Sequence, residues 1–356
     1  MAKRTCQAKT ITMQKEITSP SPLLDENGEL VQVGWARRPY LDCNLENVHF
    51  YRFRPLQTLR IKRWDYYGVT TPDFFLSATL AHMGYAGTVF VYMLDFASGE
   101  LHEETLLVPL GRGIYLARNS DRGDSYFDSG RVRVAFRLEE DARRVQVNWP
   151  AFNRGEGIAA DFALHCPSDH ESMVIVTPIG GRRFYYNRKS NCMPAEGWVS
   201  RGDRRFRLRP SDGLGNLDWG RGVWKYRSFW IWASASGFLE NGQTLGLNMG
   251  RGFGDPSAAT ENALILNGRI HKLEEITFDY DSSDFMCPWQ MTSSDGRLKL
   301  EFVPFKERVA RSSLLLIRSE VHQIFGRYSG TLVADDGKTF RLRDLTGFAE
   351  EHHARW

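Results

Sequence analysis

Several features that mark other classes of protein are missing from this chain of 356 residues. No stretch approaches the 18 consecutive apolar residues of a membrane-spanning helix. The first residues, MAKRTCQAKTITMQKEITSPSP, are basic at the start but lack the apolar segment of a secretory signal. We therefore expect a soluble, cytoplasmic protein without a membrane span.

Cysteine is scarce, with five residues at positions 6, 43, 166, 192 and 287 and no CxxC pair. An odd, scattered set argues against a disulfide framework and against a structural zinc site, and it suits a reducing compartment. The run Glu350–His353 holds common metal-ligand types, but successive strand residues point to opposite faces. We interpret that run as a solvated tail and predict no metal site.

Nucleotide and nucleic-acid signatures are also missing. The net charge is only +3 and the basic residues are dispersed, which excludes the usual footprint of a nucleic-acid-binding protein. The chain has no P-loop, HExxH or GxSxG motif, and the glycine-rich run 250–254 lacks the GxGxxG spacing and predicts a tight turn instead. We expect no cofactor and no nucleic-acid partner, and the sequence leaves the oligomeric state open.

What the chain does contain is a high aromatic content, 13%, and short apolar runs bounded by turn residues. Residues 71–83 have a helical alternative, but β-branched and aromatic residues on both sides of the 84–87 turn favour a hairpin. Residues 305–319 are the most helix-like. Four pairs between apolar runs predict type I′ hairpin turns: Asn241-Gly242, Asn267-Gly268, Asp295-Gly296 and Asp336-Gly337.

These patterns predict an all-β protein with few helices. We expect two consecutive antiparallel barrels or sandwiches packed together, with a seam near Pro178–Gly181. The predicted division is an N-terminal arm (1–33), a first unit (34–180) and a second unit (181–356). No fixed-period repeat occurs, which disfavours a propeller or a solenoid.

The stretch Leu214–Gly237, LGNLDWGRGVWKYRSFWIWASASG, holds four of the chain's ten tryptophans. From Trp224 onward the even positions carry large rings and hydroxyls, so a strand here would present them on one face. Such a face suits either a dense core or the wall of a cavity for an apolar ligand. The candidate ligand contacts are Trp219, Trp224, Tyr226, Trp230, Trp232, Asn248, Asn262 and Tyr328.

Asp218 lies in an apolar setting in this stretch, where desolvation would favour its protonated form and make it a candidate general acid. Arg221, three residues on, is predicted either to tune that acid or to form a structural ion pair with it. His271 follows a predicted turn and would lie opposite Asn262 or Ala263. It is a candidate for proton transfer, with an ordinary strand histidine as the alternative.

The segments LDWGRGVWKYRSFWIWASASG, ENALILNGRIHKLEEITFDYD and LTGFAEEHHARW resemble a bacterial family of unknown function, the domain numbered two-eight-zero-four. The resemblance runs from about Gly34 to Trp356. More distantly, the chain is similar to calycin-like double barrels such as carotenoid hydratases and cyclases that act on prenyl chains. That likeness implies a lipocalin-like fold with a cavity for an apolar molecule, and a catalytic Asp or Glu in the members that are enzymes.

Three functional hypotheses follow. The first is a cofactor-independent lyase or isomerase acting on a lipid- or isoprenoid-like molecule by hydration, dehydration or cyclisation, with Asp218 as the proton donor. The second is a non-catalytic carrier or sensor for such a molecule. The third is a structural β-protein whose aromatic residues form only a core.

Overall fold

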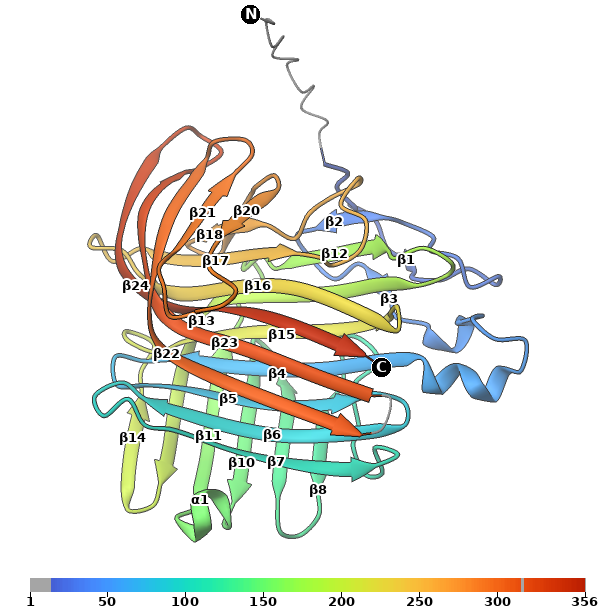
Figure 1. The fold of residues 1–356 in the computed structure, drawn as a ribbon, viewed down its shortest axis with the longest axis horizontal. Coiled ribbons are helices and arrows are strands. Elements are labelled where there is room, and N and C mark those ends of the chain that lie inside the picture. Colours follow the sequence, from blue (N-terminus) through green and yellow to red (C-terminus); the bar gives the residue numbers. More distant parts are fainter. Residues whose placement is uncertain (1–13, 315–316, 356) are drawn as a thin grey trace, which may run out of the picture.

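The structure, a computed structural model, describes residues 14–314 and 317–355 and is built almost entirely of antiparallel strands (Figure 1). The first large sheet has 13 strands and the second has nine. A small parallel pair, β1 (Ser21–Pro22) and β3 (Leu41–Asp42), and the short helices η1 (Leu45–Asn47), η2 (Arg54–Leu59) and α1 (Phe152–Gly155) complete the described chain. The predicted all-β fold is confirmed.

The first sheet holds every strand of the chain between residues 34 and 223 except β3. Its strands are β2 (Gly34–Ala36), β4 (Ile61–Thr70), β5 (Phe74–His82), β6 (Ala86–Asp95), β7 (Leu101–Pro109), β8 (Ser125–Asp128), β9 (Arg133–Glu139), β10 (Ala142–Trp149), β11 (Ile158–His165), β12 (Met173–Pro178), β13 (Phe184–Arg201), β14 (Arg204–Leu208) and β15 (Leu214–Val223). The predicted hairpin is confirmed as β5 and β6. The long strand β13 joins two halves of this sheet, because its first part pairs with β12 and β15 and its last part with β11 and β14.

The second sheet follows after a turn at residues 224–226. Its strands are β16 (Arg227–Phe238), β17 (Thr244–Arg251), β18 (Ala263–Leu266), β19 (Arg269–Lys272), β20 (Ile276–Asp279), β21 (Trp289–Ser293), β22 (Leu298–Leu314), β23 (Ile317–Val333) and β24 (Thr339–Arg355). The sequence pattern of residues 305–319 indicated a helix, and that prediction is wrong. The described residues of this range belong to β22 and β23, which pair along almost their whole length. The predicted seam after residue 180 falls between β12 and β13, which pair within the first sheet.

Turn chemistry explains the hairpins only in part. Asn267 and Gly268 both have positive φ, at 47° and 74°, as a type I′ turn requires. In the three other predicted pairs only the glycine has positive φ. All four pairs nevertheless separate strands that pair with each other. The positions of these turns were therefore predicted correctly, whereas the I′ type holds for one.

Three apolar clusters organise the interior. One lies within the first sheet around Trp219, and a second lies within the second sheet around Tyr328. The third, called here the inter-sheet layer, joins side chains of both sheets, including Tyr185, Trp230 and Phe348. In Figure 1 the first part of β23 and the last part of β24 lie over the first sheet, and the Phe75 and Phe325 rings, 5.1 Å apart, mark the contact.

A bulge in β13 fastens the sheets together. The pairing with β15 shifts between Ser190 and Met193, and Cys192 adopts a positive φ of 59°. The bulge directs Asn191 toward the second sheet, where its Nδ2 donates to Ser234 Oγ at 2.9 Å and to the carbonyl of Ala235 at 3.1 Å. Both sheets are thus held in fixed register at the layer between them.

The described residues contain neither a membrane-spanning helix nor a disulfide. No helix within residues 14–314 and 317–355 combines the length and apolar character needed to cross a membrane. The four described cysteines, Cys43, Cys166, Cys192 and Cys287, are free, which agrees with the predicted lack of a disulfide framework. Cys6 lies outside the described part of the chain.

Candidate active site in the inter-sheet layer

The alternation of β15 divides the tryptophan-rich stretch between two environments. Trp219 points into the first core, whereas Asp218 and Gly220 lie on the face toward the second sheet. Gly220 pairs with Trp64 of β4, and a Cβ at Gly220 would lie only 2.1 Å from the Trp64 ring. The glycine therefore lets the indole lie across the strand, where its Nε1 donates to Asp218 Oδ1 at 3.1 Å.

Asp218 belongs to a buried polar cluster. Asn187 Nδ2 donates to its Oδ1 at 2.5 Å, and Lys189 Nζ lies 3.3 Å from its Oδ2. Lys189 and Asp218 face each other across β13 and β15 and are 2% and 8% exposed. The carboxyl predicted from the sequence is therefore held inside the protein, with a cation as its neighbour.

The second sheet supplies the other side of the cluster. Trp230 and Trp232 of β16 lie opposite His352 and Glu350 of β24. Lys189 Nζ sits 3.7 Å from the centre of the Trp232 ring, an arrangement in which the ring face attracts the cation. Trp230 Nε1 donates to Glu350 Oε1 at 3.4 Å.

Glu261 has the fewest hydrogen bonds of the three carboxyl groups in this cluster. Its Oε1 lies 3.6 Å from Lys189 Nζ, and neither carboxyl oxygen makes a hydrogen bond among the described residues. A Cβ at Gly250 would lie 2.2 Å from Glu261 Oε1, so this glycine makes room for the carboxyl. Asn248 holds the segment, because its Nδ2 donates to the Glu261 carbonyl at 2.7 Å and its Oδ1 accepts from Trp232 Nε1 at 2.9 Å.

Two carboxyl groups of the cluster, those of Glu261 and Glu350, have pKa values near neutral pH. Burial raises the pKa of Glu261 to about 7, although Lys189 acts in the opposite direction. Burial likewise raises the pKa of Glu350 to about 7, again opposed by Lys189. Three carboxyl groups, including that of Asp218, thus gather around one lysine in a site largely closed to water. Such a cluster can both donate and accept a proton at physiological pH.

An aromatic group covers the cluster. The Phe253 ring stacks on Tyr185 with centroids 5.2 Å apart, and it also contacts Trp224 and Trp230 at 6.4 Å and 5.9 Å. Tyr185 is fully buried, and its hydroxyl has no hydrogen-bond partner among the described residues. Burial raises the pKa of Tyr185 well above its ordinary value, so the hydroxyl remains a neutral donor.

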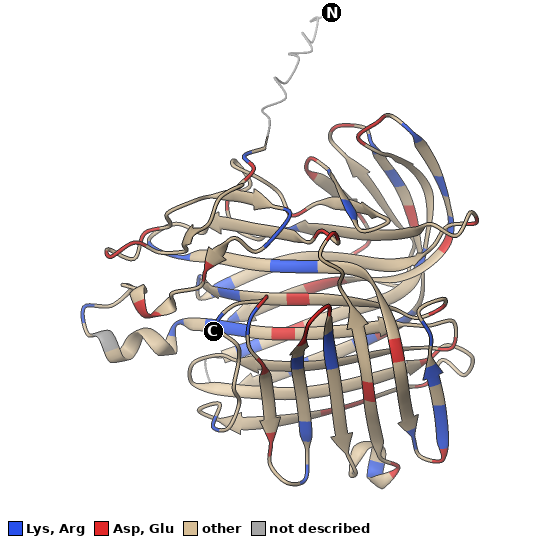
Figure 2. Cartoon of the chain, turned by 180° about the vertical axis from the view of Figure 1, so that it is seen from behind, with Lys and Arg blue, Asp and Glu red and all other residues tan. Residues whose placement is uncertain are grey.

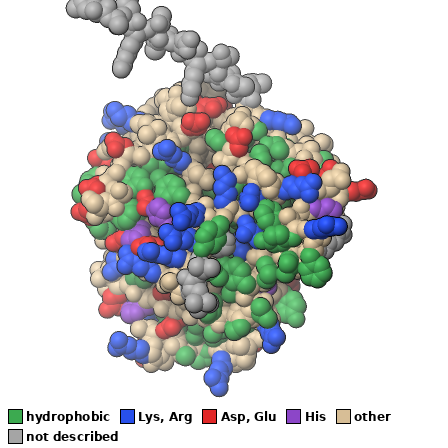
Figure 3. Space-filling view, turned by 45° about the vertical axis from the view of Figure 1, so that its right-hand side comes forward, with side chains coloured by type: hydrophobic (Ala, Val, Ile, Leu, Met, Phe, Trp, Pro, Cys, Tyr) green, Lys and Arg blue, Asp and Glu red, His purple; other side chains and the backbone are tan. Residues whose placement is uncertain are grey.

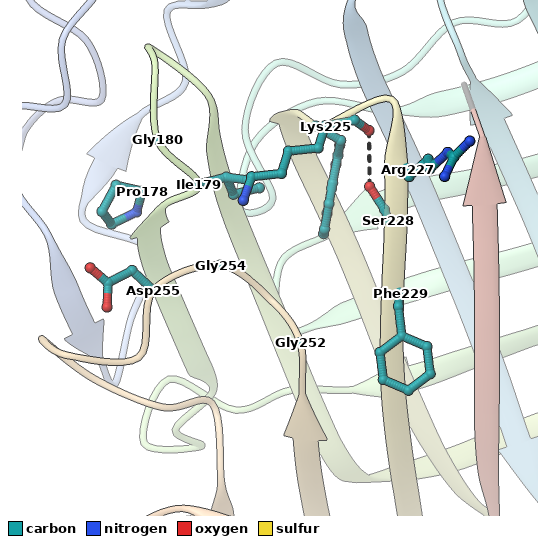
Figure 4. Close-up of a pocket in the computed structure, with 11 residues that line it drawn as sticks. Pro178, Ile179, Gly180, Lys225, Arg227, Ser228, Phe229, Gly252, Gly254 and Asp255 are labelled. Atoms are coloured by element: carbon teal, nitrogen blue, oxygen red, sulfur yellow. Dashed lines mark hydrogen bonds between the residues drawn. The ribbon is translucent and has the colours of Figure 1, made fainter. Parts of the chain in front are cut away.

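Two pockets lie on either side of the Gly252–Gly254 loop. One, of about 400 Å³, is lined by Glu261, Phe253 and Ile175. The other, of about 470 Å³, is lined by Trp224 and Phe229 (Figure 4). Both volumes suit a small organic ligand. In Figure 4 Lys225 extends across the second pocket toward Ile179, whereas Arg227 points away from it.

The predicted catalytic residues do not form one group. Arg221 pairs with Asp65 at 2.8 Å, and the predicted contact with Asp218 is wrong. The reason is that β15 continues through Arg221 without a glycine turn, so residues three apart lie on opposite faces. His271 lies opposite Leu264 rather than Asn262 or Ala263, and its Nδ1 is 3.4 Å from Asp335 Oδ2.

The predicted ligand contacts fall into four groups. Trp224 and Asn262 line pockets. Trp230, Trp232 and Asn248 lie in or against the inter-sheet layer. Trp219 and Tyr328 are buried in the two other cores, and Tyr226 is 43% exposed. These eight residues therefore do not share one face, because they come from several strands whose side chains alternate between faces. Their role as ligand contacts stays a prediction.

The interpretation of Glu350–His353 as a solvated tail is wrong. These residues belong to β24, where Glu351 is buried and burial lowers the pKa of His352 to about 3. Lys189, Glu261 and Glu350 were not predicted as site residues. The alternation of Phe348, Glu350 and His352 along β24 is the sequence pattern that places them on one face. Within the described ranges, no three His, Cys, Asp or Glu side chains group to hold a metal ion.

Comparison with known proteins yields structural relatives of low sequence identity. A protein from Nitrosomonas europaea provisionally assigned as AttH is 15% identical, with 82% of this chain and 92% of that chain covered and a TM-score of 0.49. CghA bound to Sch210972 is 10% identical, with coverage of 83% and 88% and a TM-score of 0.49. Kievitone hydratase from Nectria haematococca is 11% identical, with the same coverage and a TM-score of 0.43.

The comparison with curated proteins found no match. A family match, by contrast, spans residues 14–356, nearly the whole sequence. This chain therefore belongs to the family described as Domain of unknown function (DUF2804).

Proposed function

We propose that this protein binds a lipid- or isoprenoid-like small molecule between its two sheets and acts on it as a cofactor-independent lyase or isomerase. The observation that supports the proposal most strongly is Glu261. Its carboxyl is buried, makes no hydrogen bond among the described residues, has a pKa raised to about 7, and borders a pocket lined by both apolar and polar side chains. A buried polar group left without a hydrogen bond costs about 1–3 kcal/mol, a cost that a substrate or a bound water would offset.

In this proposal Glu261 transfers the proton. A neutral Glu261 carboxyl protonates an alkene carbon, and the resulting cation is stabilised by the Phe253 ring, which lines the same pocket. Addition of water, with loss of a proton back to the Glu261 carboxylate, completes a hydration. Loss of a proton from carbon instead completes an isomerisation or a cyclisation.

Asp218, predicted from the sequence as the acid, takes a positioning role here. Its oxygens already accept hydrogen bonds from Asn187 and Trp64 and contact Lys189. Asp218 therefore holds the lysine in place beside Glu261 rather than meeting the substrate. Tyr185, whose hydroxyl has no hydrogen-bond partner among the described residues, supplies a further donor to the same space.

The test begins with native mass spectrometry of the protein purified from its own host, followed by incubation with the recovered molecule. Glu261→Gln keeps the shape of the side chain and removes the titrating proton, so we expect binding without conversion. Glu275→Gln is the matched control, because Glu275 is an exposed residue on the rim of the same pocket. Conversion by Glu261→Gln at the wild-type rate would refute the acid role.

A carrier is the second candidate, and the tight packing of the rings favours it. Phe253 and Trp230 are in contact over the cluster, which suits retention of a ligand as well as catalysis. A carrier would return the bound molecule unchanged after prolonged incubation at neutral pH. Purified protein with no bound molecule, and no uptake of one, would leave the aromatic layer as a structural core.

A further inference from the structure

A basic and apolar projection stands beside the entrance of one pocket. Residues 50–63, FYRFRPLQTLRIKR, surround η2 and contain no acidic residues and five basic ones, of which Lys62 is buried. Several of their large apolar side chains face the solvent, with Phe53 the most exposed at 63%. The other exposed ones are Tyr51, Leu56 and Leu59.

The turn between the two sheets lies next to this projection. Ile61, at the start of β4, pairs with Val223, at the end of β15. Arg60 Nη2 donates to the carbonyl of Trp224 at 2.9 Å and so ties the projection to the turn. Lys225, Tyr226 and Arg227 are all exposed there. We define the basic–apolar surface as Tyr51, Arg52, Phe53, Leu56, Leu59, Lys225, Tyr226 and Arg227.

The views agree on this arrangement. The projection around η2 extends beyond the sheets on the side where the chain ends (Figures 1 and 2). Figure 3, turned to bring that side forward, shows hydrophobic and basic side chains gathered together with few acidic ones among them. Residues 219–230 likewise contain no acidic residue.

The same turn forms part of a pocket. Trp224, Lys225 and Arg227 line the cavity of about 470 Å³. A ligand taken up at the basic–apolar surface would therefore lie next to the entrance of this pocket. This juxtaposition is what an extraction route for a hydrophobic molecule requires.

We infer that the basic–apolar surface docks on a membrane containing anionic lipid. Exposed apolar side chains enter the boundary between headgroups and acyl chains, while the surrounding cations attract lipid phosphates, and reversible attachment needs both contributions. The exposed cations Arg52, Lys225 and Arg227 outnumber Asp255, the acidic residue in the lining of the same pocket, so the surface is complementary to an anionic headgroup layer. The inference goes beyond the proposed function and holds whether or not the inter-sheet site is catalytic.

The experiment is co-sedimentation of the full chain with phosphatidylcholine vesicles prepared with or without phosphatidylglycerol. We expect binding to the anionic vesicles only, and release by high salt. Lys225→Gln with Arg227→Gln should weaken the partition constant about fivefold for each charge removed. Phe53→Ser with Leu56→Ser should weaken it at least as much, because each substitution removes buried apolar area.

Matched controls use exposed residues elsewhere on the first sheet. Arg131→Gln with Arg133→Gln removes two charges at the β8–β9 hairpin, and Leu107→Ser removes an apolar side chain that is 59% exposed on β7. Both controls should bind vesicles like the wild type. Equal losses in controls and surface variants, or no binding to anionic vesicles, would overturn the inference. A dimer in solution that Phe53→Ser dissociates, without vesicle binding, would instead identify a second copy as the occupant.

Discussion

Replacing Glu261 by glutamine should stabilise the protein at alkaline pH. The ordinary pKa of this carboxyl is 4.5, and burial raises it to about 7 in the folded protein. A difference of this size corresponds to about 3 kcal/mol between the two protonation states. Glutamine has nearly the same shape and no charge, so Glu261→Gln avoids the cost of burying a carboxylate.

The direction of the pH dependence follows from proton binding. Between pH 4.5 and about 7 the folded chain keeps the Glu261 proton while the unfolded chain has released it. The unfolding free energy of the wild type therefore decreases as the pH rises through this window, and the stabilisation by the proton is lost above it. Glu261→Gln should match the wild type near pH 4.5 and exceed it by about 3 kcal/mol at pH 8.

Urea unfolding followed by tryptophan fluorescence at several pH values measures this difference. Glu240→Gln, in the exposed β16–β17 turn, is the control and should leave the difference from wild type independent of pH. Since Glu350 titrates in the same range beside the same lysine, Glu261→Gln with Glu350→Gln should gain less than the sum of the single variants. If the unfolding free energies of the wild type and Glu261→Gln differed by the same amount at every pH, the reasoning would be refuted.

Two further predictions concern the strand beneath the cluster. Gly220→Ala places a Cβ about 2.1 Å from the Trp64 ring, so the urea midpoint should fall by the equivalent of about 1–3 kcal/mol; an unchanged midpoint would contradict the packing. A double-mutant cycle should give a coupling energy of about 1–3 kcal/mol between Arg221 and Asp65 and none between Arg221 and Asp218. Coupling in the second pair would mean that the ion pairing is assigned incorrectly.

The sequence was sufficient for the fold class because strand signals are local. The hairpin around Gly84 and the pairs such as Asn267-Gly268 specify turns through their own backbone preferences. Residues 305–319 misled the prediction because β22 is defined by its partner β23, and a pairing partner is not visible in a local pattern. The predicted division of the chain after residue 180 stays a prediction; β12 and β13, which lie on either side of that point, pair with each other in the first sheet.

The site was predicted less completely, and the reason is again distance along the chain. Lys189, Asp218, Glu261 and Glu350 come from four separate segments, and only the stacking of one sheet on the other brings them together. Asp218 was found because tryptophans flank it in sequence. Arg221 was placed wrongly because the glycines around it suggested a turn, whereas they allow close packing within a straight strand.

Photolabelling is the most direct test of the central claim, that a hydrophobic molecule binds between the two sheets. A long-chain alcohol carrying a diazirine would be irradiated with the protein and the labelled peptides identified by mass spectrometry. The account predicts labels within residues 250–262 and 184–189, which border Glu261 and its pocket, and their loss when an unlabelled competitor is added. Labels confined to the exposed residues 50–59, or spread evenly over the surface, would contradict it.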